Sequence, residues 1–350
     1  MPAATAGFSP LDRQLELGDN TWSEGVGREA AFLSAAVPSF DLAQAILKRI
    51  GQIEISKPSV WRSAQEAGER FQALEAVEQE RANALPERWE PPSRAEVVDQ
   101  RMGVSMDGAS IYVRQEGWKE LKIGVVFDIA VGPTQDKETG EIVDLAHATN
   151  NSYVAHLGGP DTLGEKTWAE ARRRGWEQAQ DTEVLGDGAP WIWNQAALHF
   201  GRSHQVLDWY HAKTHLVAAA RLLKQEGTAA FTRWLNRRET LLYQGHALTI
   251  AQGLEQAAQR DLVNAEELIT AAGYFRSNHH RMNYIEMREE GWPIGSGVVE
   301  SGAKQFKARF SGPGMRWSRQ GAQNLLPIRA AVLSRRFDHT WAAAKNLPPT

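Results

Sequence analysis

Hydrophobic and polar positions follow different periods along this 350-residue chain, and these periods divide it into segments. Residues 1–20 are small, polar and turn-rich, and we expect them to form a flexible N-terminus. From 21 to 92 apolar residues recur every three or four positions, which is typical of helices. A first helix is predicted to begin after the N-cap residue Ser39 and to end near Gly51. Its predicted apolar stripe comprises Leu42, Ile46, Leu47 and Ile50.

A second helix is predicted to begin at Ser56, after a turn that contains Gly51. Two short helices joined in this way are typical of a helix-turn-helix, whose second helix enters the major groove of DNA. Lys57 and Arg62 are then the candidate DNA contacts. A helical bundle that never touches DNA produces the same pattern, so this alternative stays open. The prolines in 91–93 mark the end of the helical region.

The period changes from helix to strand near residue 100. Three consecutive strands joined by hairpin loops are predicted, and they cover 103–113, 121–129 and 144–157. A helix over 164–180 then precedes a short apolar strand. Three antiparallel strands, a helix and a strand beside the first are the order of a ribonuclease H-like α/β core with a mixed sheet. Residues 100–195 are therefore predicted to be the first part of such a core.

Two acids occur where these strands meet turns. Asp187 stands between Gly186 and Gly188, directly after the short apolar strand, and Asp107 precedes Gly108 inside an alternating run. A strand that delivers an acid at its carboxyl end commonly places that acid at a functional edge of a sheet. An Asp-Gly pair is also ordinary turn chemistry. On adjacent strands, however, the two carboxylates would lie side by side.

Helical spacing returns after Asn194, and residues 196–290 are predicted to form an all-helical insertion. A stretch rich in glycine, over 291–297, ends this pattern. A new helix opens directly after it, and residues 291–340 are predicted to complete the core with a basic C-terminal helix.

A third acid, Glu300, stands at the start of this last helix. Lys304 and Lys307 follow at helical spacing, so the three side chains share one face. A glutamate and a lysine at this spacing most often form a solvated salt bridge. Three carboxylates brought together repel one another unless cations compensate their charge. Because the chain has no cysteine, the acids suit Mg²⁺ better than structural zinc, and Mn²⁺ is the expected substitute.

The chain resembles the DDE transposases of bacterial insertion sequences, in particular the Kra group, which is related to the Mutator-type transposases with a helical insertion. Four motifs carry the resemblance, which runs from about Phe8 to Arg336: Met106-Asp107-Gly108, the run from Gly186 to Ile192, Asp208-Trp209-Tyr210-His211, and the run from Gly295 to Ser301. The relatives also carry a cysteine-rich segment before the stretch matched by Pro10-Leu11-Asp12. This chain begins close to that point, so recognition of terminal repeats lies outside the match.

The resemblance implies a catalytic and metal-binding triad of Asp107, Asp187 and Glu300, with His211 near the scissile phosphate. It also implies Mg²⁺-dependent cleavage and strand transfer at insertion-sequence ends. The expected partner is double-stranded DNA, both the terminal inverted repeats and the target, bound by a homodimer or higher oligomer. We expect a cytoplasmic, nucleoid-associated protein, because no apolar run is long enough to span a membrane.

The formal net charge of −4 excludes a uniformly basic surface, but the C-terminal region is locally basic. Such a patch neutralises phosphates and makes binding salt-dependent. The candidate DNA contacts in this region are Lys304, Lys307, Arg309, Arg316, Trp317 and Arg319. Trp317 is a candidate for stacking on a displaced base, although most tryptophans are core anchors. The run Arg172–Arg174 is either a further DNA contact or a solvated helix face.

Two other classes of function are compatible with parts of this pattern. A glycosidase with paired carboxylates would explain two of the acids and the 13 tryptophans, but neither the third acid nor the basic region. A catalytically inactive or domesticated transposase would bind DNA without cutting it. Dependence on a divalent metal separates the enzyme from this second class.

Overall fold

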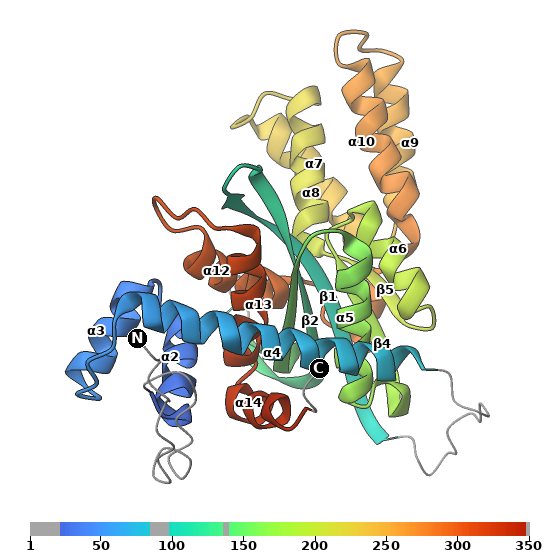
Figure 1. Cartoon of the computed structure of the whole chain (residues 1–350). Helices are drawn as coiled ribbons and strands as arrows, with labels where there is room; N and C mark the ends of the chain where they lie inside the picture. The colour runs from blue at the N-terminus through green and yellow to red at the C-terminus, as the bar shows by residue number, and fades with distance from the viewer. Residues whose placement is uncertain (1–21, 85–97, 136–139, 348–350) are drawn as a thin grey trace, which may run out of the picture.

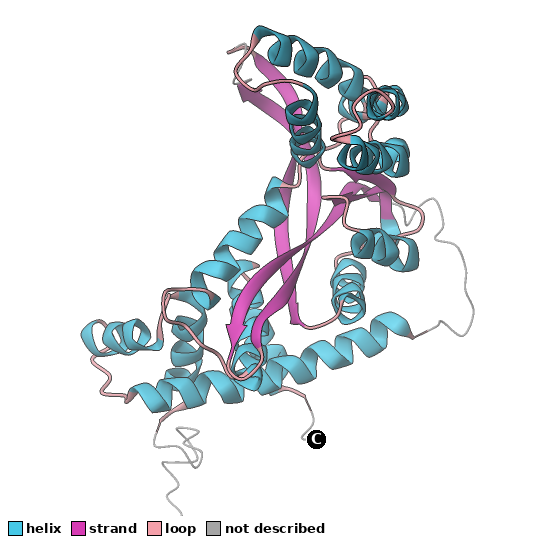
Figure 2. Cartoon of the chain, turned by 90° about the horizontal axis from the view of Figure 1, so that it is seen from above, coloured by secondary structure: helices cyan, strands magenta, loops and turns pink. Residues whose placement is uncertain are grey.

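The computed structural model describes residues 22–84, 98–135 and 140–347. Its centre is a mixed sheet, drawn in magenta in Figure 2. The sheet has five strands in the order β3-β2-β1-β4-β5. The strands are β1 (Val98–Val113), β2 (Gly117–Gln135), β3 (Ile142–Leu157), β4 (Ala179–Gly186) and β5 (His204–Leu207). β1, β2 and β3 pair antiparallel, whereas β4 runs parallel to β1 and β5 parallel to β4. The fold is therefore a mixed α/β fold.

Alternating side chains of β1 divide the core into two layers, because successive residues of a strand point to opposite faces. Met102, Val104 and Met106 pack into one buried cluster with helices α5, α6 and α7. Ile111 and Val113 pack into another with α4, α12, α13 and α14. The helices on these two faces are α4 (Lys57–Asn83), α5 (Pro160–Arg173), α6 (Pro190–His199), α7 (Trp209–Leu223), α12 (Gly297–Phe310), α13 (Arg319–Leu333) and α14 (Phe337–Lys345).

The long helix α4 joins the N-terminal helices to the core. It packs against α13, α14 and α5, and it runs across the molecule (Figure 1). Contact with α13 is close at Gly68, where an added Cβ would lie 2.1 Å from the backbone oxygen of Asn324. Two shorter helices, α2 (Glu24–Ala36) and α3 (Phe40–Arg49), pack beside its first half.

Between β5 and α12 in the sequence, the chain forms a set of helices that we call the helical group. Helices α9 and α10 form a hairpin that extends away from the sheet (Figure 1). The elements of this group are α8 (Ala229–Tyr243), α9 (Ala247–Ala258), α10 (Ala265–Asn278), the short helix η2 (His279–Arg281) and α11 (Tyr284–Glu289), with α7 at their base. No helix in the described part of the chain is both long and apolar enough to cross a bilayer.

The strand predictions are confirmed, and each of the three predicted ranges lies within β1, β2 or β3. The helix predicted over 164–180 begins earlier, at Pro160, ends at Arg173, and is followed by the short helix η1 (Trp176–Gln178). The N-caps Ser39 and Ser56 are also as predicted, since both side chains accept a hydrogen bond from the backbone. Residues 1–21 and 85–97, which include the predicted flexible N-terminus and the predicted boundary at 91–93, lie outside the described residues.

Two predictions for the described residues differ from the structure, one for the range 196–290 and one for the buried face of α3. The range 196–290 is not all helical, because it contains β5, whose four residues are too few to reveal a period of two. The predicted apolar stripe of α3 is only partly right. Leu47 is buried, together with Ala43, whereas Leu42 and Ile50 are exposed.

Candidate functional site

The sheet brings Asp107 and Asp187 to the same level on neighbouring strands. In the parallel pairing of β1 with β4, Ser105 lies opposite Leu185. Each acid lies two residues further along its strand. Asp107 is still inside β1, opposite Ile123 of β2, while Asp187 directly follows β4. Both side chains are half-buried.

Local backbone groups hold both carboxylates. The Gly108 N–H donates to Oδ1 of Asp107 at 2.6 Å, and the Ala189 N–H donates to Oδ1 of Asp187 at 2.8 Å. Among the described residues the second oxygen of each acid has no hydrogen bond, so it is available to a ligand. The turn after Asp187 requires glycine, because Gly188 has a φ of +101°.

Glu300 lies in the first turn of α12 and is half-exposed. The segment before this helix is fixed to α7, because the Trp209 N–H donates to the Ile294 carbonyl at 2.9 Å. Lys304 lies on the same face, with its Nζ 3.9 Å from a carboxylate oxygen of Glu300. This is an exposed pair at helical spacing, which contributes little to stability.

A fourth acid, Asp208, links these elements. It follows β5, caps α7, and is fully buried. Its Oδ1 accepts hydrogen bonds from the backbone N–H of His211 at 2.6 Å and from the ring Nδ1 of His211 at 3.2 Å. Its Oδ2 accepts a hydrogen bond from the backbone N–H of Ser296. The motif Asp208-Trp209-Tyr210-His211 predicted a role for His211 alone, although Asp208 connects α7, His211 and Ser296.

The charges of Asp187 and Glu300 act on two titratable groups of the site. Burial raises the pKa of Asp107, and the negative charges of Asp187 and Glu300 raise it further. The hydrogen bond that the His211 ring donates to Asp208 raises the pKa of His211, and the charges of Asp187 and Glu300 act in the same direction. The imidazole therefore favours its positive form, which partly compensates the acids.

The pKa of Asp208 shifts in the opposite direction. Burial alone would raise it, but the hydrogen bonds from His211 and Ser296 stabilise the carboxylate and hold the pKa below its ordinary value. Asp208 is thus an ionised, buried acid whose oxygens are already bonded to protein groups. Its place in the site is to orient His211, which leaves Nε2 of that ring directed away from Asp208.

The potential metal ligands form a partial cluster. Ligand atoms of Asp208, His211 and Glu300 lie within 4.8 Å of one another, and in the described residues this is the group of three close enough to hold one ion. Asp107 and Asp187 are near but do not join this group. Because both oxygens of Asp208 are bonded to protein donors, the available oxygens of Asp107, Asp187 and Glu300 fit a hard cation better.

Tyr274 of α10 reaches the site from the helical group, although no sequence motif pointed to it. Its ring stacks on His215 with 3.6 Å between ring centroids. A Cβ on Gly188 would lie 3.3 Å from the Tyr274 hydroxyl, which is buried without a hydrogen-bond partner. Burial, together with the charges of Asp187 and Asp208, raises the pKa of this phenol.

The predicted DNA contacts of the C-terminal region divide into two groups. Lys304, Lys307 and Arg316 are exposed. Arg309 is buried instead, and its Nε donates to the Ser34 carbonyl at 2.7 Å, so the prediction that it contacts DNA is wrong. Its guanidinium is held in place by stacking on aromatic rings inside the core.

Trp317 is also buried, and its indole N–H donates to the Phe310 carbonyl at 2.8 Å. The interpretation as a base-stacking residue is therefore wrong, and Trp317 is a core anchor. Arg319 is half-exposed, but it pairs with Glu116 and also donates to the Leu157 carbonyl.

The remaining basic candidates lie elsewhere on the surface. Lys57 and Arg62 are exposed on the first two turns of α4. The Nζ of Lys57 lies 2.9 Å from Asp41, and Arg62 donates to the Ser59 hydroxyl at 3.1 Å. The run Arg172–Arg174 is neither free for DNA nor simply solvated, because each of its three side chains forms an ion pair.

Comparison with known proteins gives little further information. No protein-family model matches the chain. The chain is 20% identical over 285 residues to a Streptococcus gallolyticus protein called "UPF0236 protein in vanSb 3'region". The match covers 76% of this chain and 57% of that protein, so the chain spans little more than half of the relative's length. The name of the relative states no activity.

Proposed function

We propose that the protein is a DDE transposase that cleaves DNA at the ends of an insertion sequence and joins them to target DNA. One observation carries this proposal. The charges of Asp187 and Glu300, which come from elements far apart in the sequence, act on both Asp107 and His211. The strand order supports it, since β4 beside β1 is the arrangement expected for a ribonuclease H-like core.

Each of these residues has a role that follows from its position. Asp107, Asp187 and Glu300 would hold two Mg²⁺ ions, which stabilise the attacking and leaving oxygens of a phosphoryl transfer when they are bound. The two aspartates are held by backbone N–H groups, so each presents one oxygen in a fixed direction. Asp208 holds the ring of His211, whose raised pKa favours a positive charge toward a phosphate.

Exposed basic side chains next to this site would bind the DNA backbone. Lys304 and Lys307 extend from the helix that carries Glu300, and Arg316 follows that helix. Contacts of this kind position DNA without reading its sequence. Because two ends are joined in one reaction, we propose that a homodimer or higher oligomer assembles on the DNA.

The test is metal-dependent nicking of a labelled DNA fragment that carries the ends of the element, with Mg²⁺ or Mn²⁺ supplied. Asp187→Asn keeps the size of the side chain and removes its charge, so we expect nicking to fall by at least about 100-fold. Asp181→Asn is the matched control, because Asp181 lies on the same strand but points to the exposed His204. Nicking that is equal in both variants would contradict the proposal.

A second candidate is a transposase-derived protein that binds DNA without cutting it. The observation that favours it is that Asp107 and Asp187 do not join the close group formed by Asp208, His211 and Glu300. Salt-sensitive DNA binding without metal-dependent nicking would support this candidate. Absence of both binding and nicking would exclude both candidates.

A further inference from the structure

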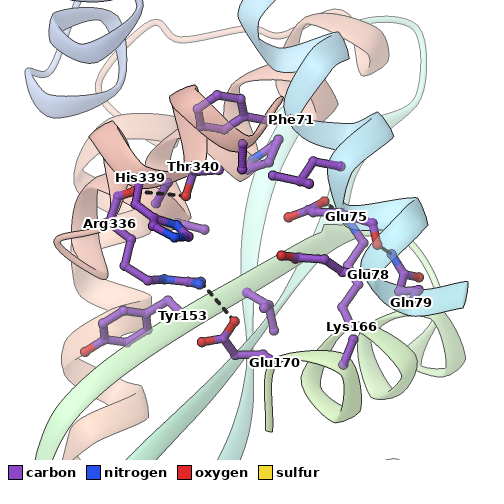
Figure 3. Close-up of a pocket in the computed structure, with 17 residues that line it drawn as sticks. Phe71, Glu75, Glu78, Gln79, Tyr153, Lys166, Glu170, Arg336, His339 and Thr340 are labelled. Atoms are coloured by element: carbon purple, nitrogen blue, oxygen red, sulfur yellow. Dashed lines mark hydrogen bonds and ion pairs between the residues drawn. The ribbon is translucent and has the colours of Figure 1, made fainter. Parts of the chain in front are cut away.

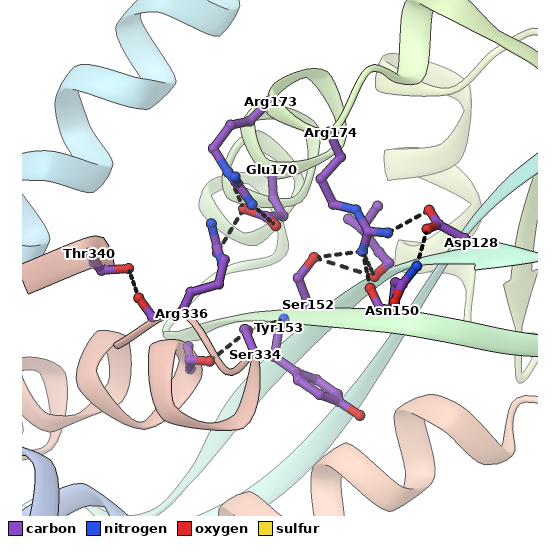
Figure 4. A network of polar contacts seen from close by, with 12 residues as sticks. Asp128, Asn150, Ser152, Tyr153, Glu170, Arg173, Arg174, Ser334, Arg336 and Thr340 are labelled. Atoms are coloured by element: carbon purple, nitrogen blue, oxygen red, sulfur yellow. Dashed lines mark hydrogen bonds and ion pairs between the residues drawn. The ribbon is translucent and has the colours of Figure 1, made fainter. Parts of the chain in front are cut away.

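A polar cavity of about 930 Å³ lies beside the candidate site and has no role in the function proposed above. Its walls come from β2, β3 and the C-terminal ends of α5 and α13, and α12 closes one side. The residues that line it include Asp128, Asn150, Arg173, Arg174, Arg335 and Arg336. We call it the arginine cavity, and Figure 4 shows most of its polar contacts.

The arginines of this cavity outnumber the acids around it. Arg174 pairs with Asp128, while Arg173 and Arg336 both pair with the buried Glu170, at 2.7 Å and 2.9 Å. Two carboxylates therefore form ion pairs with three guanidinium groups (Figure 4). The Nε of Arg336 is buried without a hydrogen-bond partner, so one donor in the wall is unsatisfied.

Arg335 adds a fourth positive charge. Among the described residues its side chain makes no ion pair or hydrogen bond, and it is exposed at the mouth of the cavity. Its backbone has a φ of +56°, which is uncommon for a side chain other than glycine or asparagine. This conformation ends α13, because the backbone N–H groups of Arg335 and Arg336 donate to the carbonyls of Val332 and Ala331. Asn150 of β3 also has a positive φ, of +48°, where the pairing register of β2 and β3 shifts.

The cavity is connected to the candidate site by shared residues. Ser301 follows Glu300 directly in the sequence, and it lines both the arginine cavity and a smaller cavity of about 290 Å³. That smaller cavity reaches Gly295 and Val298, at the start of α12. Asn151 and Tyr153 of β3 are shared in the same way. A polar path therefore follows β3 from the start of α12 to the arginines.

We propose that the arginine cavity binds a phosphate group. Guanidinium groups bind phosphate oxygens through paired N–H donors, and an excess of arginine over carboxylate leaves donors available. The source of the phosphate rests on the proposed function, under which it is the backbone of bound DNA some distance from the cleaved bond. A free phosphate compound would use the same donors.

The cavity on the other side of the Glu170–Arg336 ion pair is a poor candidate for the same ligand. It is lined by Glu75 and Glu78 as well as by apolar side chains of α4 and α13 (Figure 3). Its volume is about 50 Å³, and Lys166 in its wall is already paired with Glu75 at 2.6 Å. The Glu170–Arg336 ion pair therefore separates a small space from a large, basic one.

Arg335 allows a test that leaves the ion pairs of the wall intact. Arg335→Asn removes the charge and keeps a residue that tolerates a positive φ. Arg202→Asn is the matched control, because Arg202 is exposed in the turn before β5, at the opposite edge of the sheet. Duplex binding by the whole chain is measured by fluorescence anisotropy over a range of NaCl concentrations. The stabilising effect of inorganic phosphate is measured by thermal unfolding.

If DNA supplies the phosphate, Arg335→Asn lowers the slope of log K against log salt by about 1 and weakens binding several-fold, whereas Arg202→Asn does neither. If a free compound supplies it, the slope is unchanged, but inorganic phosphate raises the melting temperature of the wild type and not that of Arg335→Asn. The proposal is overturned if the wild type and Arg335→Asn have the same slope and inorganic phosphate does not raise the melting temperature of the wild type. Should the wild type bind no DNA, the proposed function fails, and the phosphate measurement alone still decides on the cavity.

Discussion

The carboxylate of Asp208 and the imidazole of His211 are joined by a 3.2 Å hydrogen bond, and the same carboxylate accepts the backbone N–H of Ser296. One buried acid thus fixes the start of α7 and the segment that leads to Glu300. The relative position of His211 in α7 and Glu300 in α12 therefore depends on this acid. Asp208 therefore links the helical group to the last part of the core, together with the hydrogen bond from the Trp209 N–H to the Ile294 carbonyl.

Replacing Asp208 by alanine should destabilise the protein more than replacing any exposed acid. Asp208→Ala leaves the buried N–H groups of His211 and Ser296 without an acceptor. We expect a loss of about 3–4 kcal/mol in the free energy of unfolding, measured by urea denaturation. Asp181→Ala, on an exposed part of β4, should cost less than about 1 kcal/mol. Equal losses in the two variants would mean that Asp208 does not connect the elements.

The sequence predicted the three long strands because each contains enough residues to show a clear period. It also predicted that Asp107 and Asp187 would lie on adjacent strands, since β4 was expected beside β1. β5 was missed because four residues carry too little pattern. Asp208 therefore appeared to lie inside a helix, whereas it follows a strand and caps α7.

The roles of individual side chains were harder to predict than the elements. Arg309 and Trp317 belong to a basic stretch, yet both are buried. The Nε of Arg309 donates to the carbonyl of the distant Ser34, and the indole N–H of Trp317 donates to the Phe310 carbonyl. Tyr274 comes from a helix that is remote in the sequence, so no local pattern places it near Asp187. These placements depend on tertiary contacts, which composition and periodicity do not report.

The close approach of α4 to α13 gives a prediction about glycine. Gly68→Ala places a methyl group 2.1 Å from the backbone oxygen of Asn324, and neither helix can move without separating from the core. We expect a loss of about 2–3 kcal/mol in stability. Gly273→Ala in α10 is the matched control, since no atom lies within 4 Å of the added carbon. This control should be more stable than the wild type by about 0.5–1 kcal/mol.

Thermal and urea unfolding of both glycine variants measure this difference. A Gly68→Ala protein as stable as the wild type would show that α4 and α13 are not in close contact.

The buried position of Arg309 separates stability from DNA binding. Arg309→Lys keeps the charge but loses the planar group that stacks on Phe40 and donates to Ser34, so stability should fall by about 1–2 kcal/mol. Affinity for duplex DNA should stay unchanged. The double variant Lys304→Ala, Lys307→Ala should show the opposite pattern. It should bind DNA more weakly, while its urea midpoint stays that of the wild type. If Arg309→Lys weakened DNA binding at full stability, the buried position would be wrong.

His156 provides a pH dependence that is independent of the candidate site. Burial, with the positive charges of Lys166 and Arg319, lowers the pKa of this imidazole to about 4. The unfolded chain, with an ordinary pKa of 6.5, therefore binds the proton first as the pH falls. Stability is then fully present above pH 6.5 and is lost progressively toward pH 4. Because the ring is partly exposed, we expect a loss of about 1–2 kcal/mol from this residue.

The measurement is urea denaturation of the wild type and of His156→Gln at several pH values between 7 and 4.5. Other acids titrate in the same range, so the informative quantity is the difference in the free energy of unfolding between the two proteins. This difference should change in favour of the variant as the pH falls, because glutamine has no proton to gain. A difference that is constant with pH would show that His156 titrates alike in the folded and unfolded chain, and that it is not buried beside Lys166 and Arg319.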